Sequence, residues 1–352
     1  MPSETSSPAT SSGTRFVGRA IFGAAMLAVA AGLGFAVLGG FFGDRHPLLD
    51  TLAHFRAHAC VALLFAAIAL CLVRLWAAGL AALAPACLGL VTVAPFMLPA
   101  DAPPRTEETG PRYTLLQLNL RWDLEDTAPT LRLIGELAPD VVAVQEMTGE
   151  WQDAFESIRQ RYPYQFFCAP PRFEGDVAIL SRRPFVEGDT GVCDVLSAFA
   201  ARRIDFNGVQ VIVGSEHLRW PWPGEQWRQI DRVAPRLAAL GDPLVIAGDF
   251  NATPWSAAIR AYAAASGTRT VPGVGPTWFV HGLSDTLARF VGLPIDQVLV
   301  SQGVNVVSVE RPVGTGSDHL PVLLTFTLAL GGLPEPSIQT VERTPTLRGD
   351  QQ

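Results

Sequence analysis

The sequence predicts a single α/β domain with one β-sheet packed on another, preceded by a hydrophobic segment with three transmembrane helices. Hydrophobic residues make up 49% of the 352 positions, and the excess is concentrated between residues 16 and 98. From Tyr113 onward, short apolar runs that end in polar residues alternate with helical or loop stretches. Alternation of this kind is typical of α/β domains.

Three stretches of the hydrophobic segment are long enough to cross a bilayer, whose core of about 30 Å needs roughly 20 apolar helical residues. They cover residues 16–42, 57–77 and 79–98. A secretory signal peptide would have a shorter apolar core, so we expect the first span to be retained. A buried helical hairpin is the alternative, but these segments show no polar stripe.

The arginines around the spans indicate a topology. Arg15 and Arg19 precede the first span, and Arg74 separates the second from the third. Cytoplasmic loops are enriched in basic residues, so the N-terminus is expected inside. Arg45 and Arg56, in the first outer loop, weaken this bias. Three crossings then predict a multi-pass protein of a bacterial inner membrane whose α/β domain is periplasmic or extracellular.

Composition divides the chain into five predicted parts. Pro-rich residues separate the hydrophobic segment from the α/β domain, and polar, Pro-containing sequence follows that domain. The parts are a disordered tail (1–15), a membrane anchor (16–98), a linker (99–111), the α/β domain (112–328) and a disordered C-terminal tail (329–352).

Charge and cysteine content exclude some classes of function. All basic residues are arginine, and residues 112–328 hold 18 arginines against 24 acidic residues, a formal balance of −6. Tight nonspecific binding of duplex nucleic acid is therefore disfavoured. No CxxC or Cys/His spacing suggests zinc. Cys168 and Cys193 can form a disulfide outside the cytoplasm, but their spacing leaves that pairing open.

The α/β domain contains seven predicted strands and two segments with helical spacing. The strands cover residues 113–118, 141–144, 178–180, 209–213, 244–247, 297–300 and 322–326, and the helical segments cover 130–137 and 226–240.

Polar groups stand at the ends of six of these strands. They are Asn119, the pair Gln145 and Glu146, His217, the segment 248–251, Asp296 and the segment 317–319. Each alone is more often a turn residue or a solvated side chain than a functional group. Because sheets gather strand ends at one edge, the six groups together predict one pocket.

Hydrolysis of phosphate esters suits this set of side chains. Glu146 and Asp318 supply carboxylates, which are hard ligands for Mg²⁺ or Mn²⁺. Asp249 and Asn251 point the same way if their strand continues, and can then hold one attacking water. An imidazole paired with a carboxylate, as His319 with Asp296, can carry a proton or hold a phosphate oxygen.

Four segments carry a family resemblance: PDVVAVQEM, IAGDFNATPWS, PIDQVLVS and GSDHLPV. With NLRWD, SEHL and GPTW, they resemble the successive motifs of the endonuclease/exonuclease/phosphatase superfamily over residues 112–328. This family includes pancreatic deoxyribonuclease, apurinic endonucleases, inositol polyphosphate 5-phosphatases and bacterial sphingomyelinases. The resemblance implies a four-layer α/β sandwich with its site on one edge.

The resemblance also implies roles for the strand-end residues. Asn119, Glu146 and Asp318 would hold the metal. Asp249 would orient or deprotonate the nucleophilic water with Asn251, Asp296 would pair with His319, and His217 would touch the phosphate or help the leaving group. Whether His319 acts as the base or as a phosphate clamp stays open.

One segment departs from the family pattern. Nuclease members place an aromatic residue and a Glu ahead of the central strand, where this chain has Phe173, Glu174 and Asp176. Phe173 has no hydroxyl group, and Glu174 aligns only with a shift. The leaving-group side of the site is therefore less defined than the metal side.

Two further groups of residues have both a functional and a purely structural interpretation. Arg202 and Arg203 can grip a phosphate bidentately, but surface strands carry such arginines as often. Trp220, Trp222 and Trp227 follow His217 in a Pro-rich loop. That loop can stack a base or meet lipid, or its tryptophans can simply cap the core.

We therefore expect a membrane-anchored hydrolase that uses Mg²⁺ or Mn²⁺ and in-line attack by water. Its substrate is a phospholipid head group, a nucleic acid or a small phosphorylated metabolite, and no obligatory protein partner is implied. One alternative is a catalytically silent binding or scaffold module of the same fold. Another is a transport or sensor unit, which is disfavoured because the spans offer no ion path, their charged residues being flanking arginines.

Overall fold

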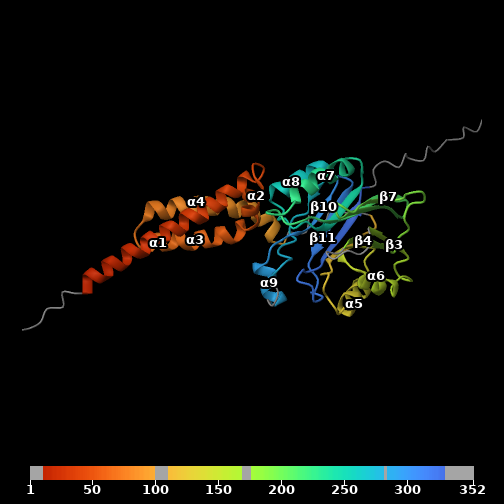
Figure 1. The fold of residues 1–352 in the computed structure, drawn as a ribbon, viewed down its shortest axis with the longest axis horizontal. Helices are drawn as coiled ribbons and strands as arrows, with labels where there is room; N and C mark the ends of the chain where they lie inside the picture. Colours follow the sequence, from red (N-terminus) through yellow and green to blue (C-terminus); the bar gives the residue numbers. More distant parts are fainter. Residues whose placement is uncertain (1–10, 100–109, 169–175, 281–283, 330–352) are drawn as a thin grey trace, which may run out of the picture.

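The computed structural model describes residues 11–99, 110–168, 176–280 and 284–329. Most of the predicted tails and of the predicted linker lies outside the described residues. The chain forms a helical bundle that abuts one end of an α/β sandwich (Figure 1).

The bundle contains four α-helices and one short 3-10 turn. They are α1 (Ser11–Gly39), η1 (Gly40–Phe42), α2 (Pro47–His54), α3 (Arg56–Leu72) and α4 (Trp76–Met97). Two segments, Val17–Phe42 and Trp76–Met97, are long and apolar enough to cross a membrane. The expected second span corresponds to α3, which has 17 residues and meets α2 at a bend of 67°. The segment between the first two spans, expected as an outer loop, thus contains a helix.

The sandwich contains two six-stranded mixed sheets. The order in the first is β11 (Val304–Glu310), β12 (Val322–Leu328), β1 (Tyr113–Asn119), β2 (Val141–Met147), β4 (Asp176–Ser181) and β3 (Tyr164–Cys168). The order in the second is β5 (Val192–Asp194), β6 (Phe199–Phe206), β7 (Val209–His217), β8 (Leu244–Asp249), β10 (Asp296–Val300) and β9 (Arg269–Thr270). Only the pairs β1·β2 and β7·β8 are parallel; the other neighbours are antiparallel.

Helices cover the outer face of each sheet, so the four predicted layers are present (Figure 1). The first sheet carries α5 (Ala128–Leu137) and α6 (Gly149–Glu156), and the second carries α7 (Gln226–Ala238) and α8 (Ala257–Ser266). The helix α9 (Asp285–Val291) lies outside these layers, beside the bundle. Aliphatic side chains such as Leu115, Val213 and Val298 fill the space between the sheets.

All seven predicted strands lie within strands of the sandwich, and the helical segments correspond to α5 and α7, the second prediction running two residues past the end of α7. The strands β3, β5, β6, β9 and β11 were not predicted. Cys168 on β3 and Cys193 on β5 form a disulfide. Both strands are at sheet edges, so the bond that the sequence left open joins the first sheet to the second.

The bundle docks on the sandwich through α2 and the end of α4. The buried Asp50 carboxylate accepts hydrogen bonds from the backbone N–H of Ala257 (2.6 Å) and Ala258 (3.0 Å) at the start of α8. The indole of Trp255 donates to the Ala53 carbonyl at 2.6 Å. These contacts hold the loop between β8 and α8 against the bundle.

A second loop of the sandwich is also bound to the bundle. The backbone N–H groups of Gly273 and Gly275 donate to the carbonyls of Pro95 (3.0 Å) and Phe96 (2.9 Å). Gly275 has φ of 73°, in the left-handed region where a side chain is disfavoured. The two docked loops lead into the polar strand ends described next.

Candidate active site

Strand register brings the polar strand ends to one edge of the sandwich. In the second sheet His217 pairs with Asp249, and Asp249 pairs with Asp296, so three adjacent strands place their polar residues side by side. In the first sheet Asn119, the last residue of β1, pairs with Gln145 of β2. We call this edge the site edge.

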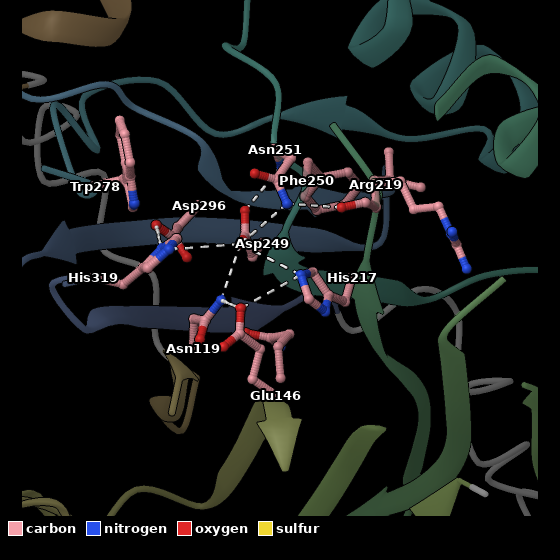
Figure 2. A network of polar contacts seen from close by, with 12 residues as sticks. Asn119, Glu146, His217, Arg219, Asp249, Phe250, Asn251, Trp278, Asp296 and His319 are labelled. Atoms are coloured by element: carbon pink, nitrogen blue, oxygen red, sulfur yellow. Dashed lines mark hydrogen bonds and ion pairs between the residues drawn. The ribbon is translucent and has the colours of Figure 1, made fainter. Parts of the chain in front are cut away.

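The Asp249 carboxylate lies at the centre of the group (Figure 2). Its Oδ2 is 3.7 Å from Nε2 of His217 and 3.7 Å from Nε2 of His319, and it accepts a hydrogen bond of 3.0 Å from Nδ2 of Asn119. Burial raises the pKa of Asp249 to about 6, against the opposing charges of the two histidines. A carboxylate in this environment can accept a proton near neutral pH.

Asn251 reaches Asp249 by a route that differs from the one expected. The strand β8 ends at Asp249, and Asn251 has φ of 46°, so the chain turns rather than continuing. The Asn251 N–H donates to Asp249 Oδ1 (2.8 Å), and its side-chain amide donates to the Leu218 carbonyl (2.8 Å). A local turn, not strand alternation, therefore brings the two side chains together.

His319 and Asp296 form the expected pair. Nδ1 of His319 is 2.9 Å from Oδ2 of Asp296, and both residues are buried. Burial lowers the pKa of His319, but the charges of Asp296 and Asp249 outweigh this effect and raise it to about 10. The ring is therefore a positively charged donor at neutral pH, with Nε2 turned toward Asp249.

Glu146 lies at the more exposed side of the group, in a strained backbone conformation. Its φ is 57°, at an irregularity in the pairing of β2 with β4, and such a conformation costs about 1–3 kcal/mol. Glu146 accepts hydrogen bonds from Nδ2 of Asn119 (3.0 Å) and from the N–H of Trp122 (3.0 Å). Strain of this size at a polar pocket is typical of a functional position.

Asp318 lies beside this group but is held by an aromatic residue. The indole Nε1 of Trp278 donates to Asp318 Oδ2 at 3.1 Å, and Trp278 also pairs with His319 through an isolated β-bridge. The charge of Asp318 contributes to the raised pKa of His319. Asp318 thus contributes negative charge at the His319 side, and its metal role stays a prediction.

The donor set fits a divalent cation. Ligand atoms of Glu146, His217 and Asp249 lie within 4.8 Å of one another, as do those of Asp249, Asp296 and His319. Carboxylate oxygens are the ligands that Mg²⁺ and Mn²⁺ prefer. The Asn119 amide nitrogen faces Glu146, while its oxygen accepts from the Arg121 N–H, so Asn119 would bind a cation after its amide turned over.

A buried polar chain behind the site was missed from the sequence. Nε2 of Gln117 donates to Asp296 Oδ1 (2.8 Å) and to Gln145 Oε1 (2.8 Å), and Nε2 of Gln145 donates to Ser215 Oγ (2.9 Å). The chain crosses from the first sheet to the second and fixes the partner of His319. Gln117 carried a signal, because it is the one polar residue within the apolar run that precedes Asn119.

Of the other residues singled out from the sequence, only some lie in the described part of the chain. Phe173 and Glu174 lie outside the described residues, and Asp176 begins β4. Arg202 forms an ion pair with Asp189 at 3.2 Å and stacks on the rings of Phe166 and Phe185. These surroundings are those of a structural residue and favour that interpretation of Arg202 over the phosphate grip.

The fold and the site together define a class of protein. A four-layer sandwich presents a carboxylate-rich site with two histidines, and its ligand set can hold a divalent cation. A model of the Endonuclease/Exonuclease/phosphatase family matches residues 116–319, more than half of the chain. The chain belongs to this family, whose members hydrolyse phosphate esters.

Two curated proteins of Vibrio vulnificus match part of the chain. UPF0294 protein VV2535 of strain YJ016 and UPF0294 protein VV1_1880 of strain CMCP6 are each 33% identical over 122 residues. The match covers 34% of this chain and 39% of each relative's length.

Solved structures with similar folds share little sequence with the chain. An endonuclease/exonuclease/phosphatase family protein from Leptotrichia buccalis has a TM-score of 0.49 at 17% identity, covering 61% of this chain and 100% of its own. An AP endonuclease from Archaeoglobus fulgidus has a TM-score of 0.48 at 18% identity, covering 60% and 98%.

Proposed function

We propose that this protein is a membrane-anchored, divalent-metal-dependent hydrolase of phosphate esters. The observation that carries the proposal is the position of Asp249 between two histidines, next to the carboxylate of Glu146. This arrangement offers a proton acceptor, a charged donor and a cation ligand around one point, as hydrolysis of an anionic ester requires.

In the proposed reaction, Asp249 orients the attacking water and takes its proton on Oδ2. Asn251 supports this role, because its N–H binds the other oxygen of Asp249 and keeps the carboxylate in place. His319, charged and braced by Asp296, donates from Nε2 to a phosphate oxygen. This assigns His319 as the clamp and Asp249 as the base.

Glu146 would hold Mg²⁺ or Mn²⁺ together with Asn119, and Asp318 would add negative charge to the same shell. When bound, the cation neutralises the charge that develops on the phosphate. His217, the more exposed of the two histidines and close to Glu146 and Asp249, would protonate the leaving oxygen.

Two observations support a periplasmic or extracellular position for the α/β domain on a multi-pass anchor. Arg19 on α1 donates a hydrogen bond to the Val73 carbonyl (2.6 Å), in the turn between α3 and α4 that also carries Arg74. This turn is at the end of the bundle remote from the sandwich (Figure 1), as expected for the cytoplasmic side. The Cys168–Cys193 disulfide suits an oxidising compartment. Three crossings require α2 and α3 to act as one span.

The proposal is tested by hydrolysis of bis-p-nitrophenyl phosphate and p-nitrophenyl phosphate by the full-length protein in detergent, with Mg²⁺, Mn²⁺ or EDTA. We expect metal-dependent turnover that falls at least about a hundredfold in His319→Ala and Glu146→Ala. Arg159→Ala, an exposed change far from the site edge, is the control. Absence of turnover with every ester would favour the catalytically silent module.

A further inference from the structure

The docked loops fix how the site edge is oriented. The loop that carries Asn251 is bound to Ala53 and Asp50 of the bundle, and the loop that leads to Trp278 is bound to Pro95 and Phe96. Both attachments are at the same end of the bundle (Figure 1). Because α1 and α4 are long and apolar enough to cross a membrane, a bundle placed in a bilayer would turn the site edge toward the membrane surface at that end.

The strongly exposed, large apolar side chains of the described α/β domain lie on loops at this site edge and on helix α9. Trp122 follows β1, and its N–H binds Glu146. Trp220 (48% exposed) and Trp222 (49% exposed) follow His217, and the Trp220 ring contacts that of Trp278 at 5.7 Å. Tryptophans therefore lie on two sides of the site.

Other exposed apolar residues lie farther out along the same edge. Val195 and Leu196 join β5 to β6, whose first residue pairs beside His217, and Val313 is in the loop that carries His319. Among the described residues, the loops at the opposite edge, such as the turn between β6 and β7, expose no comparable side chain. An apolar surface restricted to one edge marks a contact with lipid or protein.

Helix α9 connects this apolar edge to the bundle. Phe290 is 75% exposed and Leu287 46% exposed, while Ala288 packs on Phe279 and Leu320 next to the site. Nε2 of His58, near the start of α3, donates to the Val291 carbonyl at 2.8 Å. Helix α9 thus places exposed apolar side chains between the bundle and the site edge, which favours lipid over a protein partner.

We propose that the substrate is the phosphodiester of a lipid in the membrane that holds the bundle, an inference that rests on the proposed phosphoesterase function. Water attacks the phosphorus, its oxygen forms the new P–O bond, and the ester P–O bond to the leaving alkoxide breaks. A proton from the water ends on that alkoxide, which gives a phosphomonoester and an alcohol. The acidic balance of the domain, −6, argues against a polyanionic nucleic acid.

Quenching by brominated lipid tests the contact itself, independently of catalysis. The variants Phe290→Trp and Gln210→Trp each add one indole, at the site edge and at the opposite end of β7. In proteoliposomes, bromine on the acyl chains is expected to quench the added emission of Phe290→Trp and to leave that of Gln210→Trp unchanged. Equal quenching of the two variants, or no quenching of either, would show that the site edge does not face the membrane.

Turnover tests the substrate, with the full-length protein in vesicles of phosphatidylethanolamine, phosphatidylglycerol and phosphatidylcholine in equal parts. We expect release of products from phospholipid at least about tenfold faster than from the deacylated glycerophosphodiesters. Phe290→Ser with Leu287→Ser should lower phospholipid turnover about tenfold and leave bis-p-nitrophenyl phosphate turnover unchanged; Gln210→Ser should change neither. A tenfold change corresponds to about 1.4 kcal/mol of transition-state stabilisation.

The soluble ester separates the two proposals. If bis-p-nitrophenyl phosphate is cleaved but phospholipid is not, or if deacylated diesters are cleaved equally fast, the lipid inference fails and the phosphoesterase proposal stands. If no ester is cleaved, both fail.

Discussion

Nε2 of Gln117 donates a hydrogen bond of 2.8 Å to Oδ1 of Asp296, while the other oxygen of Asp296 holds Nδ1 of His319. Gln117 belongs to the first sheet and Asp296 to the second, so one contact across the sandwich sets the orientation of a proposed catalytic pair. Gln117 is buried and acts on His319 through Asp296, which makes it a positioning residue.

Replacing Gln117 should lower kcat more than the loss of stability alone explains. Gln117→Leu leaves Asp296 Oδ1 and Gln145 Oε1 without this donor, at a cost of about 1–3 kcal/mol in the free energy of unfolding. We expect kcat to fall roughly tenfold to a hundredfold, as for lost supporting contacts at other sites. Gln165→Leu, which removes a half-buried glutamine on β3, should lower Tm with unchanged kcat. Equal kcat values in the two variants would contradict the positioning role.

Metal binding should be visible as a rise in thermal stability. At a concentration of Mg²⁺ or Mn²⁺ a hundred times its Kd, the free energy of unfolding should increase by about 2.7 kcal/mol. Glu146→Gln keeps the shape but removes a charged ligand, so the Tm shift on adding metal should disappear. Glu136→Gln, an exposed change on α5, should keep the full shift. A Tm shift that persists in Glu146→Gln would show that other residues bind the metal.

The contact between α2 and α8 should stabilise the protein and support catalysis. Asp50→Ala removes the acceptor of two backbone N–H groups at a helix start, a loss of about 1–2 kcal/mol. Because the preceding loop carries Asn251, we expect kcat to fall with Tm in the detergent-solubilised protein. Asp44→Ala, which removes an exposed carboxylate paired with Arg45, is the matched control and should change neither. An unchanged kcat in Asp50→Ala would show that the contact holds the bundle on the sandwich but does not support catalysis.

The disulfide should account for a measurable part of the stability. Breaking a disulfide between cysteines 25 positions apart is expected to lower the free energy of unfolding by about 2–4 kcal/mol, so a reductant should lower Tm. Cys168→Ser, Cys193→Ser and the double variant should show the same loss, and Cys87→Ser should show none. Alkylation followed by mass spectrometry reports whether reduction adds two reactive thiols. If the reductant has no effect on Tm, the bond is absent in solution.

Glu216 should make stability depend on pH. Burial raises its pKa well above the ordinary value of 4.5, against the hydrogen bond of 2.7 Å from the Tyr262 hydroxyl. The folded protein therefore binds a proton that the unfolded chain releases, and this stabilisation, complete below pH 4.5, is lost as pH rises through the folded pKa.

Glu216→Gln removes the titration and keeps an acceptor for Tyr262. Its Tm should match that of the wild type near pH 4 and exceed it increasingly toward pH 8. Glu225→Gln, an exposed change, should follow the wild type at every pH. Parallel Tm curves for Glu216→Gln and the wild type would show that Glu216 does not titrate in this range.

The sequence alone indicated which polar residues come together at the site edge. Asn119, Glu146, His217, Asp249 and His319 follow or precede apolar runs, and strand ends meet at one edge whatever the order of the strands. Two of the three expected spans correspond to helices long and apolar enough to cross a membrane, because span length and composition are local properties. The strands β3, β5, β6, β9 and β11 were not predicted, since their pairing with partner strands contributes more to them than the pattern of their own residues.

Only the tertiary structure decided how these groups are oriented and what surrounds them. The turn at Asn251, the support of Asp296 by Gln117 and the pairing of Cys168 with Cys193 each depend on residues far apart in the sequence or on local backbone geometry. The docking of Asp50 on α8 spans 207 positions, and no periodicity or motif encodes such a contact. It arises because a buried carboxylate and two free backbone N–H groups satisfy one another where bundle and sandwich meet.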